Sequence, residues 1–159
     1  MEIFSAFSNT DREGLLRELS VVLENKGYVK ESYQESIIIR EKMHPTGLMV
    51  EDLINIAIPH TDVEHVLKPT MVVVKHSQGS FKFFRMDDPE IEIPVDVVFL
   101  LVVKESEGYV TFLAALTNLF QDADFIDMLA SSAPDKICAG LVENLNQFEL
   151  SYEGDLKRS

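Results

Sequence analysis

The feature that most constrains the fold is the run from Val95 to Val103, in which every residue except Asp96 is apolar. A strand with one wet face alternates apolar and polar residues, so a run that is apolar on both faces predicts a central strand covered on both sides. The run is far shorter than the roughly 20 residues that span a bilayer. It therefore predicts a sheet with helices packed on both faces, the α/β class.

The rest of the chain supplies helices on either side of a block of strands. Thr10 to Glu13 form a capping-box pattern at the start of a helix that Gly27 ends. Pro134 fits the first turn of a last helix. Apolar spacing and β-branched composition predict helices over about 30–44, 110–120 and 125–129, strands over 54–58, 70–75 and 81–86, and an irregular loop over 46–55.

No internal repeat or low-complexity segment divides the chain. The length of 159 residues suits one domain with a full hydrophobic core. We expect one domain over residues 1–159 with a single sheet, a core over about 10–146, and a mobile polar tail from about Gln147. The strand order does not follow from the sequence.

Composition limits the partners and the compartment. The net charge of −13 disfavours nucleic acids and anionic membranes, although acidity also serves solubility alone. Cys138 is the one cysteine, so no internal disulfide can form, and its position near Ile137 and Leu141 predicts a packed core residue. The first residues lack the pattern of a signal peptide, so we expect a cytoplasmic protein that does not insert into a membrane.

His60 is distinguished by its place at the end of a predicted strand. Pro59 has a fixed φ and no N–H group for a ladder, so the strand ends there and a rigid turn presents the next side chain. Ligands of open α/β sheets bind beyond the carboxyl ends of strands. A histidine beside a proline is also a common turn residue, so position alone leaves a structural role open.

The surroundings of His60 predict anion binding rather than a metal. Thr61 to Glu64 form a second capping pattern, and a helical turn there would place free N–H groups beside His60. The spacing to His65 matches no standard zinc site, and a cysteine pair is missing. His44, His65 and His76 fit a helix end and solvated positions, so we expect neither a metal nor a cofactor.

Four segments in order resemble the IIA components of the bacterial phosphoenolpyruvate-dependent sugar phosphotransferase system, of the fructose and mannitol type. The resemblance as a whole runs from about Glu13 to Leu145, nearly the whole chain. The segments are Arg40-Glu41-Lys42 with Pro45-Thr46-Gly47-Leu48, then Ala57-Ile58-Pro59-His60-Thr61, Pro94-Val95-Asp96-Val97-Val98-Phe99-Leu100-Leu101 and Thr117-Asn118-Leu119-Phe120. The sequence before and at His60 is most similar to that of the galactitol branch. The resemblance implies the fold of this family, a single mixed sheet flanked by helices.

The resemblance implies a phosphoryl relay. The small carrier HPr donates a phosphoryl group to His60, which passes it to a cysteine of the IIB component as the membrane IIC component imports a sugar or polyol. A neutral imidazole nitrogen is available for this at cytoplasmic pH, because the ordinary pKa of histidine is near ~6.5. The other ring nitrogen needs an acceptor that fixes the tautomer, and the sequence does not identify it.

Three further residues receive roles from the resemblance. Arg40 is expected to donate to the phosphoryl oxygens, as a guanidinium does well, and Thr46 to add a hydroxyl donor. Tyr109 stands where many members have a second histidine. Its hydroxyl can donate a hydrogen bond but brings no positive charge, so either it performs part of that role or this branch works without it.

Two other functions remain open on the sequence alone. One is a regulatory IIA domain, similar to the nitrogen-related members, whose phosphorylated state controls another protein. The other is a binding module without phosphoryl chemistry, in which His60 is structural. The sequence leaves open the sugar and the oligomeric state, and it has no P-loop and no G-x-S-x-G motif, so neither direct use of a nucleotide nor hydrolase chemistry is expected.

Overall fold

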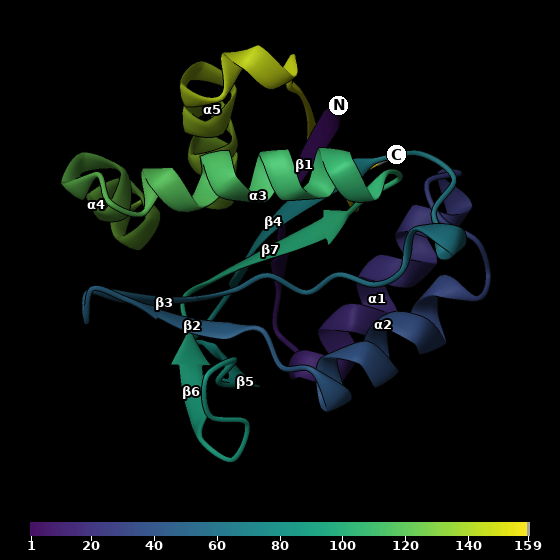
Figure 1. Cartoon of the computed structure of the whole chain (residues 1–159), viewed down its shortest axis with the longest axis horizontal. Coiled ribbons are helices and arrows are strands. Elements are labelled where there is room, and N and C mark those ends of the chain that lie inside the picture. Colours follow the sequence, from purple (N-terminus) through teal and green to yellow (C-terminus); the bar gives the residue numbers. More distant parts are fainter. Residues whose placement is uncertain (159) are drawn as a thin grey trace.

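The computed structural model describes residues 1–158, which form a mixed six-stranded sheet with helices on both faces (Figure 1). The strand order is β2-β3-β7-β4-β1-β8. Strand β7 lies parallel to β3 and antiparallel to β4, and β1 lies parallel to both β4 and β8. The sheet strands are β1 (Glu2–Ser8), β2 (Gly47–Val50), β3 (Ile54–Ala57), β4 (Thr70–His76), β7 (Val97–Val102) and β8 (Ser151–Asp155).

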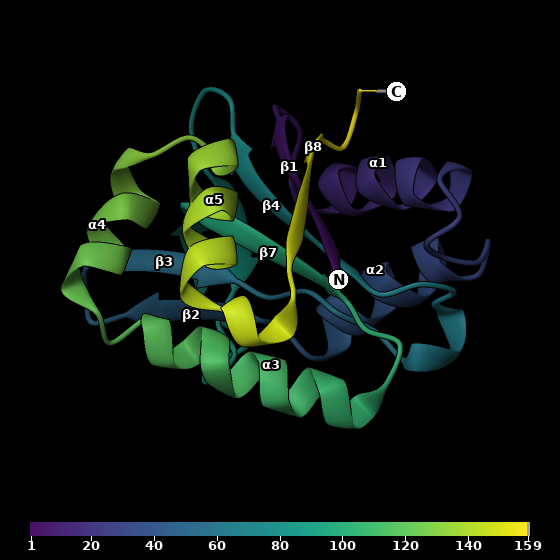
Figure 2. The same cartoon turned by 90° about the horizontal axis from the view of Figure 1, so that it is seen from above.

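The helices divide between the two faces of the sheet. Helices α3, α4 and α5 cover one face, and α1 and α2 lie on the opposite side (Figures 1 and 2). A small antiparallel ribbon, β5 (Phe81–Phe84) with β6 (Glu92–Val95), is the second sheet. The helices are α1 (Arg12–Asn25), α2 (Tyr33–Met43), α3 (Ser106–Leu119), α4 (Ala123–Ser131) and α5 (Pro134–Asn144), with short 3-10 turns η1 (Val63–His65) and η2 (Asn146–Phe148).

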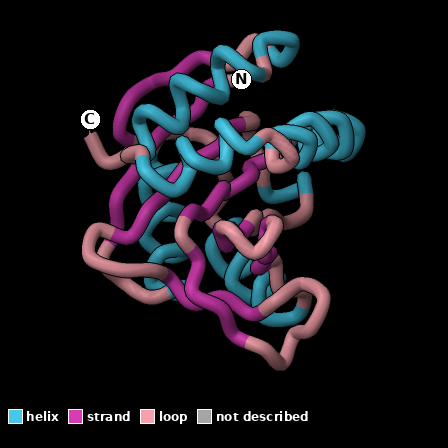
Figure 3. The backbone as a smooth tube through the Cα atoms, turned by 90° about the vertical axis from the view of Figure 1, so that its left-hand side faces the viewer, coloured by secondary structure: helices cyan, strands magenta, loops and turns pink. Residues whose placement is uncertain are grey.

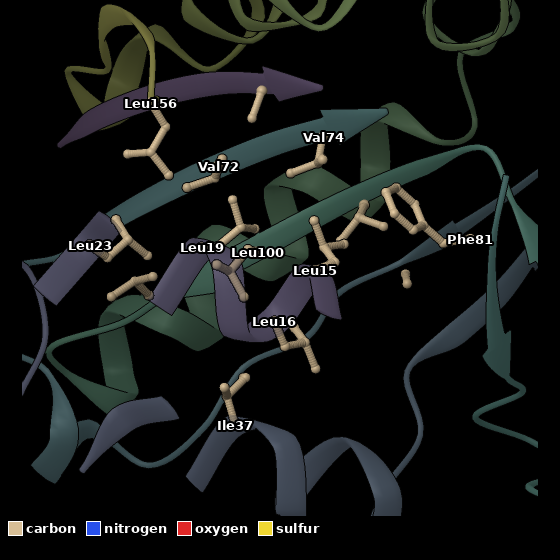
Figure 4. Close-up of a cluster of buried hydrophobic side chains, with 14 of the residues drawn as sticks. Leu15, Leu16, Leu19, Leu23, Ile37, Val72, Val74, Phe81, Leu100 and Leu156 are labelled. Carbon is tan, nitrogen blue, oxygen red and sulfur yellow. The ribbon is translucent and has the colours of Figure 1, made fainter. Parts of the chain in front are cut away.

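Strand β7 is buried on both faces, as its apolar run predicts. Val98, Leu100 and Val102 belong to the core beneath α1 and α2, whereas the alternate residues join the core beneath α3 to α5. Figure 4 shows the first of these cores, where Leu15, Leu19 and Leu23 of α1 point toward the sheet strands. The predicted α/β class with one mixed sheet is therefore confirmed, with the ribbon β5-β6 as an addition.

Strands β1 and β2 differ from the sequence-based expectation, as does β8 at the C-terminal end of the chain. Strand β1 lies inside the sheet, although the predicted core began near residue 10. Strand β2 occupies part of the expected loop over 46–55, and its hairpin with β3 turns through Glu51 and Asp52, which both have positive φ. Because this turn lacks the usual Asn-Gly or Asp-Gly pair, the sequence gives no hairpin signal there.

The C-terminal segment, expected to be a mobile tail, is η2 followed by β8. Strand β8 pairs in parallel with β1 and forms an edge of the sheet, and Leu156 just beyond β8 is fully buried. Figure 3 shows the whole backbone coloured by secondary structure, with the two ends of the chain marked. The pairing gives this polar stretch its structure, because its own composition has no strand pattern.

Candidate functional site

A rigid turn at the end of β3 presents His60. Ile58 is 2% exposed, and the carbonyl of the following Pro59 accepts a hydrogen bond of 3.0 Å from the backbone N–H of Leu101 on β7. The chain is thus attached to the central strand just before it reaches His60. The His60 side chain lies half-buried at this edge of the sheet.

The hydrogen bonds of the His60 ring define its tautomer. Nδ1 lies 2.9 Å from the carbonyl oxygen of Ile58. A carbonyl oxygen can only accept, so Nδ1 has the hydrogen and Nε2 has the free lone pair of the neutral ring. The backbone carbonyl of Ile58 is therefore the acceptor that the sequence could not identify.

Burial keeps the His60 ring neutral. Desolvation lowers its pKa below the ordinary histidine value, and the positive charge of Arg40 lowers it further. The bond from Nδ1 to the Ile58 carbonyl and the charge of Asp62 act in the opposite direction but do not reverse the shift. A neutral ring with its lone pair on Nε2 is the nucleophilic form of histidine.

Tyr109 faces the free nitrogen of His60. Strand β7 leads directly into α3 (Figure 1), whose first turn includes Tyr109. The Tyr109 hydroxyl oxygen is 3.5 Å from Nε2, and the two ring centroids are 4.9 Å apart. Burial raises the pKa of this hydroxyl, so Tyr109 keeps its hydrogen and can donate it.

Arg40 lies near both rings, in the last turn of α2. Its positive charge lowers the pKa of His60 and that of Tyr109. Its Nε atom is buried and has no hydrogen-bond partner among residues 1–158. A buried donor without an acceptor costs free energy, and an anionic oxygen beside His60 would compensate that cost.

Thr46 lies differently from the expectation. It is 3% exposed, and its hydroxyl donates to Glu41 Oε1 at 2.8 Å. The Thr46 hydroxyl oxygen also accepts a 3.3 Å hydrogen bond from the backbone N–H of Ile58. Since the hydroxyl hydrogen is held by Glu41, the geometry favours a supporting role for Thr46 over direct donation to a phosphoryl group.

The second capping pattern does not produce the expected anion site. Asp62, not Thr61, stands at the start of the single 3-10 turn η1, and its side chain caps no N–H group. Thr61 is buried and bonds to the hydroxyl of Ser36 on α2. A turn this short has no aligned set of N–H groups, so the donors near His60 come from side chains.

The other candidate groups lie outside the site. Cys138 is fully buried and its thiol donates to the carbonyl of Phe4, and burial raises its pKa to about 12, as expected of a core cysteine. Within residues 1–158, no cluster of three metal-binding side chains forms. Across the same residues, none of the helices has the length and apolar character that crossing a membrane requires.

Comparison with known proteins places the chain in a family. Residues 2–144 match the model of the family described as "Phosphoenolpyruvate-dependent sugar phosphotransferase system, EIIA 2". The galactitol-specific EIIA component of Escherichia coli K12 is 28% identical over 125 residues, which cover 79% of this chain and 81% of that protein.

Solved structures agree with this assignment. The chain is similar to the mannitol enzyme IIA of Escherichia coli in its complex with phosphorylated enzyme IIB, with a TM-score of 0.65 and 26% identity, covering 91% of this chain and 94% of the other. The crystal structure of the mannitol IIA gives a TM-score of 0.62 at 25% identity, with coverage of 88% and 94%. The chain therefore belongs to the EIIA 2 family of the phosphoenolpyruvate-dependent sugar phosphotransferase system and is a phosphotransferase of the phosphocarrier type.

Proposed function

We propose that Nε2 of His60 is the atom that receives the phosphoryl group, with HPr as the donor and the cysteine of a IIB component as the acceptor. The observation that supports this most directly is the bond from Nδ1 to the Ile58 carbonyl, which leaves Nε2 as the free nucleophile. The donors for the phosphoryl oxygens are Arg40, whose Nε has no partner within the described residues 1–158, and Tyr109, whose hydroxyl lies 3.5 Å from Nε2.

The transfer step follows from this arrangement. The Nε2 lone pair attacks phosphorus as the bond to the donor's histidine nitrogen breaks, so one P–N bond replaces another. The His60 ring gains positive character, which the Ile58 carbonyl stabilises through the retained hydrogen on Nδ1. Phosphoryl transfer needs mainly in-line positioning and charge compensation, and the turn and Arg40 supply these. In the second transfer, the thiolate of the IIB cysteine attacks phosphorus as the bond to Nε2 breaks, so a P–S bond replaces the P–N bond and His60 returns to its neutral form.

The pathway that we infer is uptake of a polyol of the galactitol type, together with a membrane IIC component. Its support is the 28% identity to galactitol-specific EIIA components. The protein would act in the cytoplasm, where HPr is phosphorylated, with no cofactor and no nucleic acid partner. The net charge of −13 suits a basic partner surface.

Intact-mass spectrometry tests the proposal. The chain is mixed with phosphoenolpyruvate, enzyme I and HPr, and compared with His60→Ala and with His76→Ala as a matched control. We expect the wild type and His76→Ala to gain one acid-labile phosphoryl group and His60→Ala to gain none. No gain by the wild type beside phosphorylated HPr would contradict HPr as the donor, and a gain from the nitrogen-type HPr alone would indicate a regulatory role.

Partner choice is tested in a second step. The phosphorylated chain is offered to purified galactitol-type and mannitol-type IIB domains, and loss of phosphate from the chain is followed over time. Transfer at least tenfold faster to the galactitol-type domain is expected. Equal rates, or faster transfer to the mannitol-type domain, would contradict the galactitol assignment but leave the phosphocarrier role intact.

A further inference from the structure

The segment that presents His60 is held by a buried carboxylate on α2. Glu41 is 4% exposed and follows Arg40 directly, yet it faces the protein interior. One carboxylate oxygen accepts the backbone N–H of Thr46 and the other accepts the Thr46 hydroxyl, both at 2.8 Å. Such a carboxylate is desolvated, and two donors from one residue compensate for part of that cost.

Thr46 extends this contact to the active-site turn. Its hydroxyl oxygen accepts the N–H of Ile58, at 3.3 Å, while the carbonyl of Ile58 accepts Nδ1 of His60, at 2.9 Å. Both backbone groups of Ile58 are therefore engaged, one by Thr46 and one by the catalytic ring. The two groups belong to different peptide units, so the effect on His60 is one of position and not of electron withdrawal.

The backbone next to Thr46 is fixed from the other side as well. The carbonyl oxygen of Gly47 accepts a hydrogen bond of 2.8 Å from the backbone N–H of Met86. A Cβ added at Gly47 would lie 2.6 Å from the backbone oxygen of Phe84, so only glycine permits this close approach. Thr46 is thus a fixed support for Ile58.

We infer that Glu41 and Thr46 are positioning residues for phosphoryl transfer, which hold the Ile58 carbonyl where it selects the Nδ1–H tautomer of His60. This inference rests on the proposed function of His60 for its kinetic consequence. The tautomer itself is a property of the unphosphorylated protein. Misplacing a reacting group by about 1 Å can lower a rate roughly 100-fold, so loss of this support has a measurable effect.

Thr46→Val against Thr46→Ser is the decisive pair of variants. Valine has the shape of threonine without the hydroxyl, whereas serine keeps the hydroxyl and loses only a methyl group. We expect Thr46→Val to lower the rate of phosphorylation by phosphorylated HPr roughly 10- to 100-fold and Thr46→Ser to restore most of it. Glu41→Gln removes the charge at constant shape and is expected to lower the rate about tenfold, with Glu35→Gln on the exposed side of the same helix as control.

Nitrogen-15 NMR of the histidine rings provides the readout that a merely structural role would not change. In the wild type we expect Nδ1 of His60 to be protonated, and in Thr46→Val and Glu41→Gln we expect mixed tautomers in a chain that is still folded. If Thr46→Val does not fold, Glu41→Gln decides the question. An unchanged tautomer and unchanged rates in the folded variants would overturn the inference. Failure of the wild type to accept phosphate would contradict the proposed function instead, because the NMR measurement needs no donor.

Discussion

His60 and His76 lie at opposite ends of the strands of one sheet, and their Nδ1 atoms have opposite roles in hydrogen bonding. His60 follows β3, which runs parallel to β7, and His76 ends β4, which runs antiparallel to β7. Nδ1 of His60 donates to a carbonyl, whereas Nδ1 of His76 accepts from the N–H groups of Gln78 and Gly79, at 3.1 and 3.0 Å. In the neutral form of each ring, Nε2 has a lone pair in His60 and a hydrogen in His76.

We infer that this difference is what prepares His60, and not His76, to act as a nucleophile. Position at the end of a strand is common to both residues. The two residues differ in the backbone group that contacts Nδ1 and in the structure that holds this group in place. For His60 the group is supported by a buried carboxylate and a threonine, whereas for His76 it belongs to an exposed turn.

Arg40→Gln should produce the largest effect. Removal of one preorganised donor to a developing anion typically costs 100-fold or more, so we expect the rate of His60 phosphorylation to fall roughly 100-fold. The pKa of His60 should rise, because the positive charge of Arg40 lowers it in the wild type. Single-turnover kinetics and an NMR pH titration measure the two changes. Arg17→Gln, which removes an exposed guanidinium paired with Glu13, is the control, and an equal loss there would refute a specific role for Arg40.

The buried charge of Glu41 predicts a pH dependence of stability. Burial raises the pKa of Glu41 from 4.5 to about 7, against the lowering effects of Thr46 and of the charge of Arg12. The folded state binds the proton of Glu41 more tightly than the unfolded state does. The stabilising contribution of Glu41 is therefore complete below pH 4.5 and is lost as the pH rises through 7. Between pH 5 and 8 the free energy of unfolding of the wild type should fall by about 2 kcal/mol relative to Glu41→Gln.

Denaturant unfolding at several pH values measures this difference. The comparison with Glu41→Gln removes the contributions of all other groups, including His60. The lowered pKa of His60 has the opposite sign, since its contribution is present above pH 6.5 and is lost as the pH falls. A difference between the two chains that stays constant with pH would show that Glu41 does not titrate in this range.

Tyr109→Phe should give the smallest effect. The hydroxyl lies 3.5 Å from Nε2, the outer limit of a hydrogen bond, and it brings no charge. We expect the phosphorylation rate to fall only about threefold, as for the loss of one neutral hydrogen bond. Tyr109→His should equal or exceed the wild type if a second histidine assists transfer. A loss as large as that of Arg40→Gln would instead make Tyr109 a principal donor.

The sequence predicts those parts of the molecule that depend on local pattern. The run Val95–Val103 predicts the central strand β7, although Val95 itself belongs to β6, and Pro59 predicts the end of β3, which the structure has at Ala57, three residues before His60. Strands β1 and β8 depend on partners far along the chain, and β8 is polar, so neither has a local signature. Their places in the sheet follow from the pairing of β1 with β4 and with β8.

Within the candidate site, the sequence identifies the side chains that the structure brings together but not their hydrogen bonds. His60, Arg40 and Tyr109 are named by the resemblance, and their electrostatic coupling appears only once α2, β3 and α3 are folded together. The acceptor for Nδ1 is a backbone carbonyl, and every residue has one, so no sequence signal could identify Ile58. The role of Glu41 was missed for a related reason, because a glutamate in a helix is usually exposed.

Nitrogen-15 and phosphorus-31 NMR of the chain after phosphorylation by HPr tests most directly whether Nε2 of His60 is the phosphorylated atom. We expect phosphorus bonded to Nε2 of His60, a hydrogen retained on Nδ1, and an unmodified His76. Phosphorus on Nδ1 of His60, or on any other residue, would contradict it, because the bond between Nδ1 and the Ile58 carbonyl could not then be what prepares the nucleophile.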